Sequence, residues 1–205
     1  MRFLKEHKSV FFLFLVWQIS LITFLVFFPK GQEFLFLNDW HRYELDVFFK
    51  IITLLGDWPA YLLAFVLFFP ILRWKAAVLV LSLAVLVPVI SQGAKNSFKH
   101  PRPGLFFKGK EQFKDIKMVS GVRLHEGLTS FPSGHTLSAF AIGSLLAFAF
   151  KERKKKVVLF ILLPVLVGLS RVYLIQHFVE DIWMGSIFGF FIALSLYFFF
   201  FERER

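Results

Sequence analysis

The segment LVGLSRVYLIQHFVEDIWMGSIFGF, residues 166–190, is apolar enough to lie in a membrane. Its middle nevertheless holds four ionisable residues within eleven positions: Arg171, His177, Glu180 and Asp181. A charged side chain at bilayer depth costs about 3 kcal/mol on insertion scales, so it usually faces a partner, a cavity or a functional site. This segment therefore predicts a membrane protein with a polar site where its last two spans are joined.

The whole chain has the composition of a membrane protein. Of its 205 residues, 57% are hydrophobic and 31 are Phe, whereas soluble domains average roughly 45–50% apolar residues. The absence of Cys excludes disulfides and thiolate metal sites. A net charge of +10 would point to nucleic acid in a soluble protein. Here Lys and Arg are expected in cytoplasmic loops and at anionic head groups, so we expect no nucleic-acid partner.

Six apolar runs of 17 to 20 residues cover most of the chain. As helices they would measure roughly 25–30 Å, which matches the hydrocarbon core of a bilayer. The sequence therefore predicts an all-α, integral membrane bundle of six transmembrane helices, with the first run retained as a span. The runs are Val10–Phe28, Gly56–Leu72, Ala76–Ala94, Ser133–Phe150, Val157–Ile175 and Ile182–Phe201.

The short loop KERKKK, residues 151–156, indicates the orientation. Basic residues in short loops favour the cytoplasm, and six spans place both termini on that side. The opposite, extracytoplasmic side holds two longer segments. Residues 30–55 include an amphipathic helix, and residues 95–132 form a loop broken by Pro and Gly. We expect a single domain over residues 1–205, with a functional core at about 91–190.

Three short motifs fall at the extracytoplasmic ends of the last four spans. Lys95 and Arg102 lie in KNSFKHPRP, Ser133 and Gly134 lie in PSGH, and Arg171 belongs to the segment quoted above. Guanidinium groups suit bidentate contacts with phosphate oxygens. PSGH opens a helix, where free N–H groups attract anions, and Gly134 lets the backbone approach a ligand. Together the motifs predict an anion site.

The same motifs supply two imidazoles. His177 and Asp181 are four residues apart, so on a helix they share a face. A carboxylate beside an imidazole fixes its tautomer and leaves the other nitrogen free to attack. His135 could then give a proton to a leaving alkoxide. These parts fit metal-free phosphoryl transfer through a phosphohistidine, whereas Glu180 is read as an interfacial carboxylate.

The chain resembles the type 2 phosphatidic acid phosphatase family of membrane lipid phosphatases. The signature of that family is K-x6-R-P, P-S-G-H and S-R-x5-H-x3-D. This sequence matches it at Lys95, Arg102 and Pro103, at residues 132–135, and at Ser170, Arg171, His177 and Asp181.

The resemblance implies a role for each matched residue. His177 would be the nucleophile, Asp181 would orient it, and His135 would protonate the leaving oxygen. Lys95, Arg102, Ser133, Gly134 and Arg171 would bind the phosphate. The family implies no metal and no cofactor, and it implies membrane lipids and a lipid phosphate as partners, with no obligate protein partner. In bacterial members the site opens at the extracytoplasmic face of the inner membrane.

The substrate follows less directly. The basic residues of the long loop favour a polyanionic head group, with lipid A 1-phosphate first. Undecaprenyl pyrophosphate, phosphatidylglycerophosphate and phosphatidic acid are the other candidates. Transfer of phosphate from lipid to lipid is an alternative with the same site. A lipid transporter or flippase is an alternative of another class, although transport favours polar groups at mid-membrane in several spans.

Overall fold

The computed structural model describes residues 2–111, 114 and 116–202, and every regular element among them is helical. The prediction of an all-α fold is therefore confirmed for these residues. In chain order the elements are α1 (Arg2–Glu6), α2 (Lys8–Phe27), α3 (Gln32–Asn38), α4 (Tyr43–Ile52), the 3-10 turn η1 (Thr53–Gly56), α5 (Trp58–Leu72), α6 (Lys75–Phe98), α7 (Pro103–Phe107), α8 (Gly134–Ala149), α9 (Lys154–Tyr173), α10 (Val179–Tyr197) and the π turn η3 (Phe198–Glu202).

The six apolar runs coincide with α2, α5, α6, α8, α9 and α10. In the described part of the chain, four helical stretches are long and apolar enough to cross a membrane. The first is α2 and the second is α6 together with α7. The third is α9, and the fourth is α10 with part of the π turn that follows it. A fifth candidate is α4 and η1 taken with α5, a pair bent by 61°. Helix α8, with 16 residues, is shorter than the spans and is apolar.

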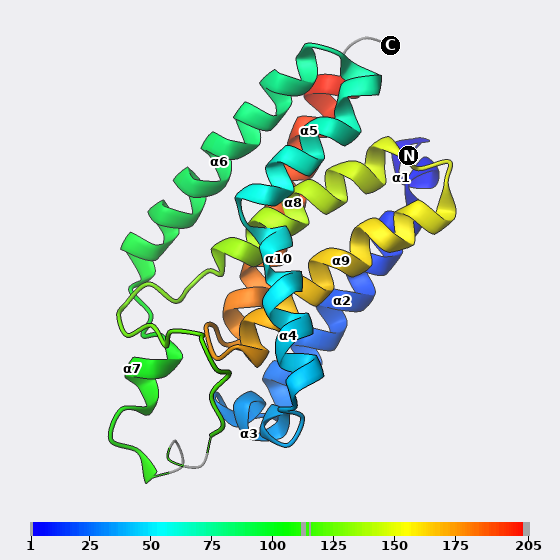
Figure 1. Cartoon of the computed structure of the whole chain (residues 1–205). Helices are drawn as coiled ribbons and strands as arrows, with labels where there is room; N and C mark the ends of the chain where they lie inside the picture. Colours follow the sequence, from blue (N-terminus) through cyan, green and yellow to red (C-terminus); the bar gives the residue numbers. More distant parts are fainter. Residues whose placement is uncertain (1, 112–113, 115, 203–205) are drawn as a thin grey trace.

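Helix α8 occupies the centre of the bundle, between α9 and α10 and next to α5 and α6 (Figure 1). Thirteen of its 16 residues are buried, so other helices cover it and its length need not match the bilayer. Two glycines on α10 allow α8 and α10 to pack closely against each other. A Cβ added at Gly185 would lie 2.7 Å from the Ser133 carbonyl oxygen, and one at Gly189 would lie 2.4 Å from that of Leu137.

The two ends of the bundle differ in character. The N-terminal helix α1, the α5–α6 turn, the α8–α9 turn and the end of α10 gather at one end (Figure 1). Glu6 pairs there with Lys151, and the Phe3 ring contacts those of Phe148 and Phe198. The first and last helices thus end on the same side as the KERKKK loop. Helices α3 and α7 and the long loop lie at the other end.

The expected amphipathic helix is α4, which leads through η1 into α5. Tyr43 and Ile51 on α4 are exposed, as an interfacial helix requires. The long loop contains α7 and is otherwise irregular among the residues described. Its residues 112, 113 and 115 lie outside the described part of the chain.

Candidate active site

His177 and Asp181 were predicted to share a helix face, but His177 lies in the connection between α9 and α10, two residues before α10 begins. Asp181 lies in the first turn of α10, where its Oδ2 accepts a hydrogen bond of 2.9 Å from the Phe178 backbone N–H and so caps the helix. The same oxygen lies 3.2 Å from His177 Nδ1. Because a carboxylate oxygen accepts, Nδ1 carries the hydrogen and Nε2 keeps its lone pair. His177 therefore has the tautomer of a nucleophile.

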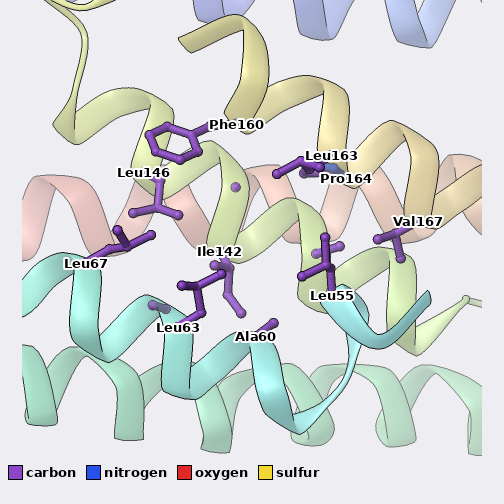
Figure 2. Close-up of a pocket in the computed structure, with 13 residues that line it drawn as sticks. Leu55, Ala60, Leu63, Leu67, Ile142, Leu146, Phe160, Leu163, Pro164 and Val167 are labelled. Atoms are coloured by element: carbon purple, nitrogen blue, oxygen red, sulfur yellow. The ribbon is translucent and has the colours of Figure 1, made fainter. Parts of the chain in front are cut away.

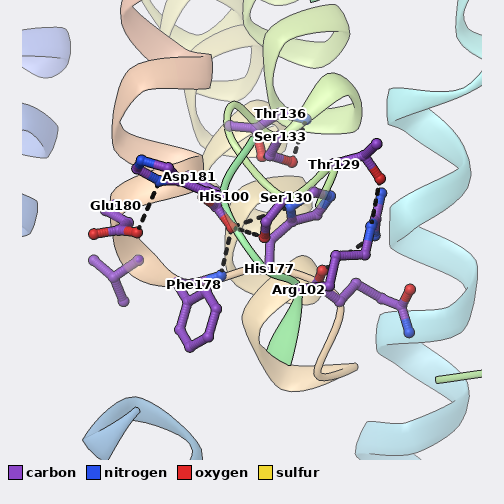
Figure 3. A network of polar contacts seen from close by, with 12 residues as sticks. His100, Arg102, Thr129, Ser130, Ser133, Thr136, His177, Phe178, Glu180 and Asp181 are labelled. Atoms are coloured by element: carbon purple, nitrogen blue, oxygen red, sulfur yellow. Dashed lines mark hydrogen bonds and ion pairs between the residues drawn. The ribbon is translucent and has the colours of Figure 1, made fainter. Parts of the chain in front are cut away.

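A third donor to Asp181 comes from a residue that the motifs do not contain. Ser130 Oγ donates to Asp181 Oδ2 over 2.5 Å, and both residues are fully buried (Figure 3). Three hydrogen bonds to one buried carboxylate oxygen fix its position. The serine thus holds the carboxylate that in turn holds His177.

The PSGH motif opens α8 beside this carboxylate. Ser133 Oγ caps the helix by accepting from the Thr136 N–H at 3.4 Å, and the Ser133 N–H donates to the Asp181 carbonyl over 3.0 Å. This second bond ties the start of α8 to the start of α10. In the part of the chain that is described, no atom accepts from the N–H of Gly134 or His135. These donors are available to an anion at the positive end of α8.

Lys95, the first residue of the KNSFKHPRP motif, meets the PSGH motif near the end of α6. A Cβ added at Gly134 would lie 3.7 Å from Lys95 Nζ and 3.2 Å from Ser91 Oγ. The ammonium therefore stands beside the free N–H groups of α8. The Lys95 ammonium has no hydrogen bond or ion pair with a described residue, which leaves its charge available to a ligand.

Two guanidinium groups complete the cationic side. Arg102 Nη1 donates to the Gln176 carbonyl oxygen and Arg102 Nε to Thr129 Oγ1, both over 3.3 Å. Arg171 is buried at the end of α9, and its Nη1 donates to Thr53 Oγ1 over 2.7 Å. Arg171 Nε is buried and has no hydrogen-bond partner among the described residues. A buried charged donor without an acceptor is costly, and an anion bound here would satisfy it.

Burial and neighbouring charge act together on His177. The residue is 2% exposed, and burial lowers its pKa well below 6.5; the nearby charges of Arg102, Arg171 and Lys95 lower that pKa further. His177 is therefore neutral at physiological pH, as an attacking imidazole must be. The same cations attract the phosphorus-bearing group that it would attack.

His135 lies in the first turn of α8. Its side chain is 33% exposed, and its Nε2 lies 3.9 Å from Asp57 Oδ2. Arg171, His177 and Lys95 are the other charges that act on it. The structure thus brings together all eight residues that the sequence motifs nominate: Lys95, Arg102, Ser133, Gly134, His135, Arg171, His177 and Asp181.

One group of possible metal ligands occurs beside this site. Ligand atoms of His100, Glu180 and Asp181 all lie within 4.8 Å of one another, the only such set of three in the described residues. The Lys30 ammonium lies 2.5 Å from Glu180 Oε1, the oxygen that also lies 3.5 Å from His100 Nδ1. A metal ion would have to displace this ammonium, so the group is better described as an ion-pair cluster. Glu180, predicted as an interfacial carboxylate, belongs to that cluster.

Sequence reasoning missed four side chains that support the site. Ser130 holds Asp181, Thr53 holds Arg171, and Asp57 faces His135. Glu33, on α3, accepts from the Val179 N–H over 3.3 Å at the start of α10. Each lies far along the chain from the residue it contacts. Only Asp57 carries a local signal, because Asp before Trp-Pro is a common start of a helix.

Comparison with known proteins finds a family match and similar sequences. The family model described as "PAP2 superfamily" matches residues 60–205. Probable lipid phosphate phosphatase 4 of Arabidopsis thaliana is 34% identical over 55% of this chain and 44% of its own length. Phosphatidylglycerophosphatase B of Bacillus subtilis is 37% identical over 43% of this chain and 46% of its own length. The chain thus spans about half the length of these relatives.

A solved structure shares the fold. The crystal structure of Aquifex aeolicus LpxE superimposes with a TM-score of 0.65 and 24% identity, over 84% of this chain and 97% of that one. The family match over residues 60–205 confirms the resemblance drawn from the motifs, and the solved structure shows the same fold.

Proposed function

The chain belongs to the PAP2 superfamily, a family of metal-independent phosphatases, and on that premise we propose that it is a membrane lipid phosphatase. The observation that carries the proposal is the meeting of three cations and two imidazoles at one end of the bundle. Arg171 Nε and the first N–H groups of α8 have no described acceptor. A phosphate group would supply acceptors to all of them.

The reaction has two steps in this proposal. His177 Nε2 bonds to phosphorus while the bond to the lipid oxygen breaks. The proton of His135 goes to that oxygen, which leaves as an alcohol. Water then attacks the phosphohistidine, gives its proton to His135, and releases inorganic phosphate and free His177. Lys95, Arg102, Arg171, the Ser133 hydroxyl and the Gly134 N–H hold the phosphate and stabilise the charge that develops on it.

We place the site at the extracytoplasmic face of the bacterial inner membrane, with both termini in the cytoplasm. In this arrangement α8 is the shielded sixth span, and α4 with η1 rests at the interface before α5 crosses. Residues 1–205 form a single domain with its core at about 91–190. The basic KERKKK loop at the opposite end of the bundle supports this orientation.

An apolar groove beside the site supports a lipid substrate. It lies between α5, α8 and α9 and has a lining that is almost wholly apolar (Figure 2). Its lining includes Leu55 and Leu63 on one side and Val167 on the other. Val167 also approaches Gly56, which packs on the His135 backbone. The groove therefore ends next to the proposed acid, where an acyl chain of the bound lipid can lie.

A pair of neighbouring leucines tests the groove. Leu63 lines it, whereas Leu62 is 60% exposed on the same helix and is not part of its lining. Leu63→Trp should raise the KM for a long-chain lipid phosphate about tenfold, because the indole fills space that a chain of several methylenes would occupy. The KM for a water-soluble aryl phosphate should stay unchanged. Leu62→Trp is the control, and equal effects of both variants on the lipid would exclude the groove.

Lipid A 1-phosphate is the substrate that we place first, because the loop after α6 is basic and suits a polyanionic head group. Phosphatidylglycerophosphate is the main alternative, and the name of the Bacillus subtilis relative favours it. Undecaprenyl pyrophosphate fits the same cationic site.

Phosphate release from a panel of these lipids by the purified protein is the direct test. We expect inorganic phosphate from at least one lipid, with no other acceptor lipid present. Loss of phosphate from the donor lipid without inorganic phosphate, and with gain by a second lipid, would instead identify a phosphotransferase. Translocation of lipid by a His177→Ala variant, without any phosphate release by the wild type, would identify a transporter.

A further inference from the structure

The break between α4 and α5 reaches the active site although no sequence motif includes it. Helix α4 and the turn η1 meet α5 at an angle of 61°, with Asp57 between them. This segment precedes residue 60, where the family match begins. Irregular backbone at membrane depth is tolerated where it is buried or lines a polar cavity. Three residues of the break contact the site.

Asp57 is anchored by one carboxylate oxygen and turns the other toward the site. Its Oδ1 accepts from the Trp58 N–H over 2.8 Å and caps α5, while its Oδ2 lies 3.9 Å from His135 Nε2. The Asp57 and His135 side chains are 54% and 33% exposed, so both are accessible to a ligand. The cap fixes the carboxylate in this position.

Gly56 brings the break into direct contact with His135. A Cβ added there would lie 2.6 Å from the His135 carbonyl oxygen and 2.9 Å from the His135 Cβ. No larger residue fits without separating the break from α8. The absence of a side chain at Gly56 therefore sets the distance between Asp57 and His135.

Thr53, one turn earlier, contacts the opposite side of the site. Its hydroxyl oxygen accepts from Arg171 Nη1 over 2.7 Å. The guanidinium is buried and has five donors in a fixed plane, so one anchored nitrogen sets the direction of the others. Arg171 Nε, which has no described partner, is thereby directed to a fixed point.

The charges around His135 explain why a carboxylate is needed there. Arg171 from α9, His177 from the α9–α10 connection and Lys95 from α6 act on the ring, and among the described residues Asp57 is the acidic group that acts with them. Burial of the ring comes first, and the two cations and any charge on His177 add to it; all of them disfavour a proton on His135. A carboxylate close to Nε2 favours that proton.

We propose that Asp57 and Thr53 are positioning residues for phosphoryl transfer: Asp57 stabilises the proton that His135 gives to the leaving lipid oxygen, and Thr53 aims Arg171 at the phosphate. This inference rests on the proposed lipid phosphatase activity. The break between α4 and α5 then acts as a fourth part of the site, supplied by a segment that the three motifs do not cover.

Asp57→Asn tests the first half, because Asn also caps helices and has the same shape, so α5 should form normally. The variant should lower kcat about tenfold with a lipid phosphate, whose alkoxide needs a proton. It should lower kcat much less with p-nitrophenyl phosphate, whose leaving group does not. The basic limb of the pH profile should move down by about one unit. Asp39→Asn, an exposed carboxylate at the end of α3, is the control.

If Asp57→Asn lowered kcat equally with the lipid phosphate and with p-nitrophenyl phosphate, Asp57 would only cap α5. An unchanged basic limb of the pH profile would show the same. Thr53→Val should raise the inhibition constant of vanadate about tenfold, because it removes one charge-assisted hydrogen bond to Arg171. Thr53→Ser keeps the hydroxyl and should restore the wild-type constant. Failure of Ser to restore vanadate binding would overturn the role of Thr53. Absence of phosphate release by the wild type would instead refute the proposed function itself.

Discussion

Removing the hydroxyl of Ser130 should weaken both the fold and the reaction. Ser130 Oγ donates to Asp181 Oδ2 over 2.5 Å, and neither residue is exposed. Ser130→Ala leaves that oxygen with two donors instead of three, the Phe178 N–H and His177 Nδ1. A hydrogen bond to a charged group contributes about 2 kcal/mol, and water cannot replace it at a buried position. The free energy of unfolding should fall by about this amount.

The effect on the rate has an upper bound. If the whole 2 kcal/mol acted only in the transition state, where His177 gains positive charge, kcat would fall about thirtyfold. The bond also exists in the resting enzyme, so we expect a loss of about tenfold. The measurements are reversible unfolding in detergent micelles and steady-state phosphate release.

Ser144→Ala is the matched control. Ser144 is also fully buried, on α8, but its Oγ has no hydrogen-bond partner among the described residues. The same chemical change there should leave stability and kcat within error of the wild type, or raise stability slightly. Equal stability and equal rates for the two variants would refute the reasoning about Asp181.

Three other outcomes are expected. Because burial lowers the pKa of His177 below 6.5 and the neutral ring is the active form, the acid limb of kcat/KM should lie below pH 6.5; a limb at or above 6.5 would contradict the neutral, buried imidazole. Arg171→Lys keeps the charge but loses the planar fork held by Thr53, so the inhibition constant of vanadate should rise about tenfold, as an inhibition assay would measure. EDTA should leave phosphate release unchanged, whereas inhibition reversed by added Mg²⁺ or Zn²⁺ would assign a metal to the group His100, Glu180 and Asp181.

The helices were predictable because the apolar runs are long and uninterrupted. Val157–Ile175 became Lys154–Tyr173, and Ile182–Phe201 became α10 with its final turn. The sequence pattern does not show that α8 is buried on all sides, because an apolar run facing lipid and one facing other helices have the same composition. The 61° break before α5 was also missed, since the predicted run began at Gly56 inside it.

The site was predictable where its residues are close in sequence or carry a chemical pattern. His177 and Asp181 are four residues apart, and the structure places their side chains in contact. Thr53 and Arg171 are 118 residues apart, and Ser130 and Asp181 are 51 apart. A threonine or a serine in an apolar chain gives no sign of such a partner. These contacts depend on how α8, α9 and η1 pack, which no local pattern encodes.

The most direct test of the account is to find which residue carries phosphate during turnover. The purified protein is mixed with a lipid phosphate, quenched under conditions that preserve phosphohistidine, and analysed by peptide mass spectrometry. The account predicts phosphate on His177 in the wild type and none in the His177→Ala variant, which should also release no phosphate. Phosphate on another residue, or turnover by the variant, would contradict the assignment of His177 as the nucleophile.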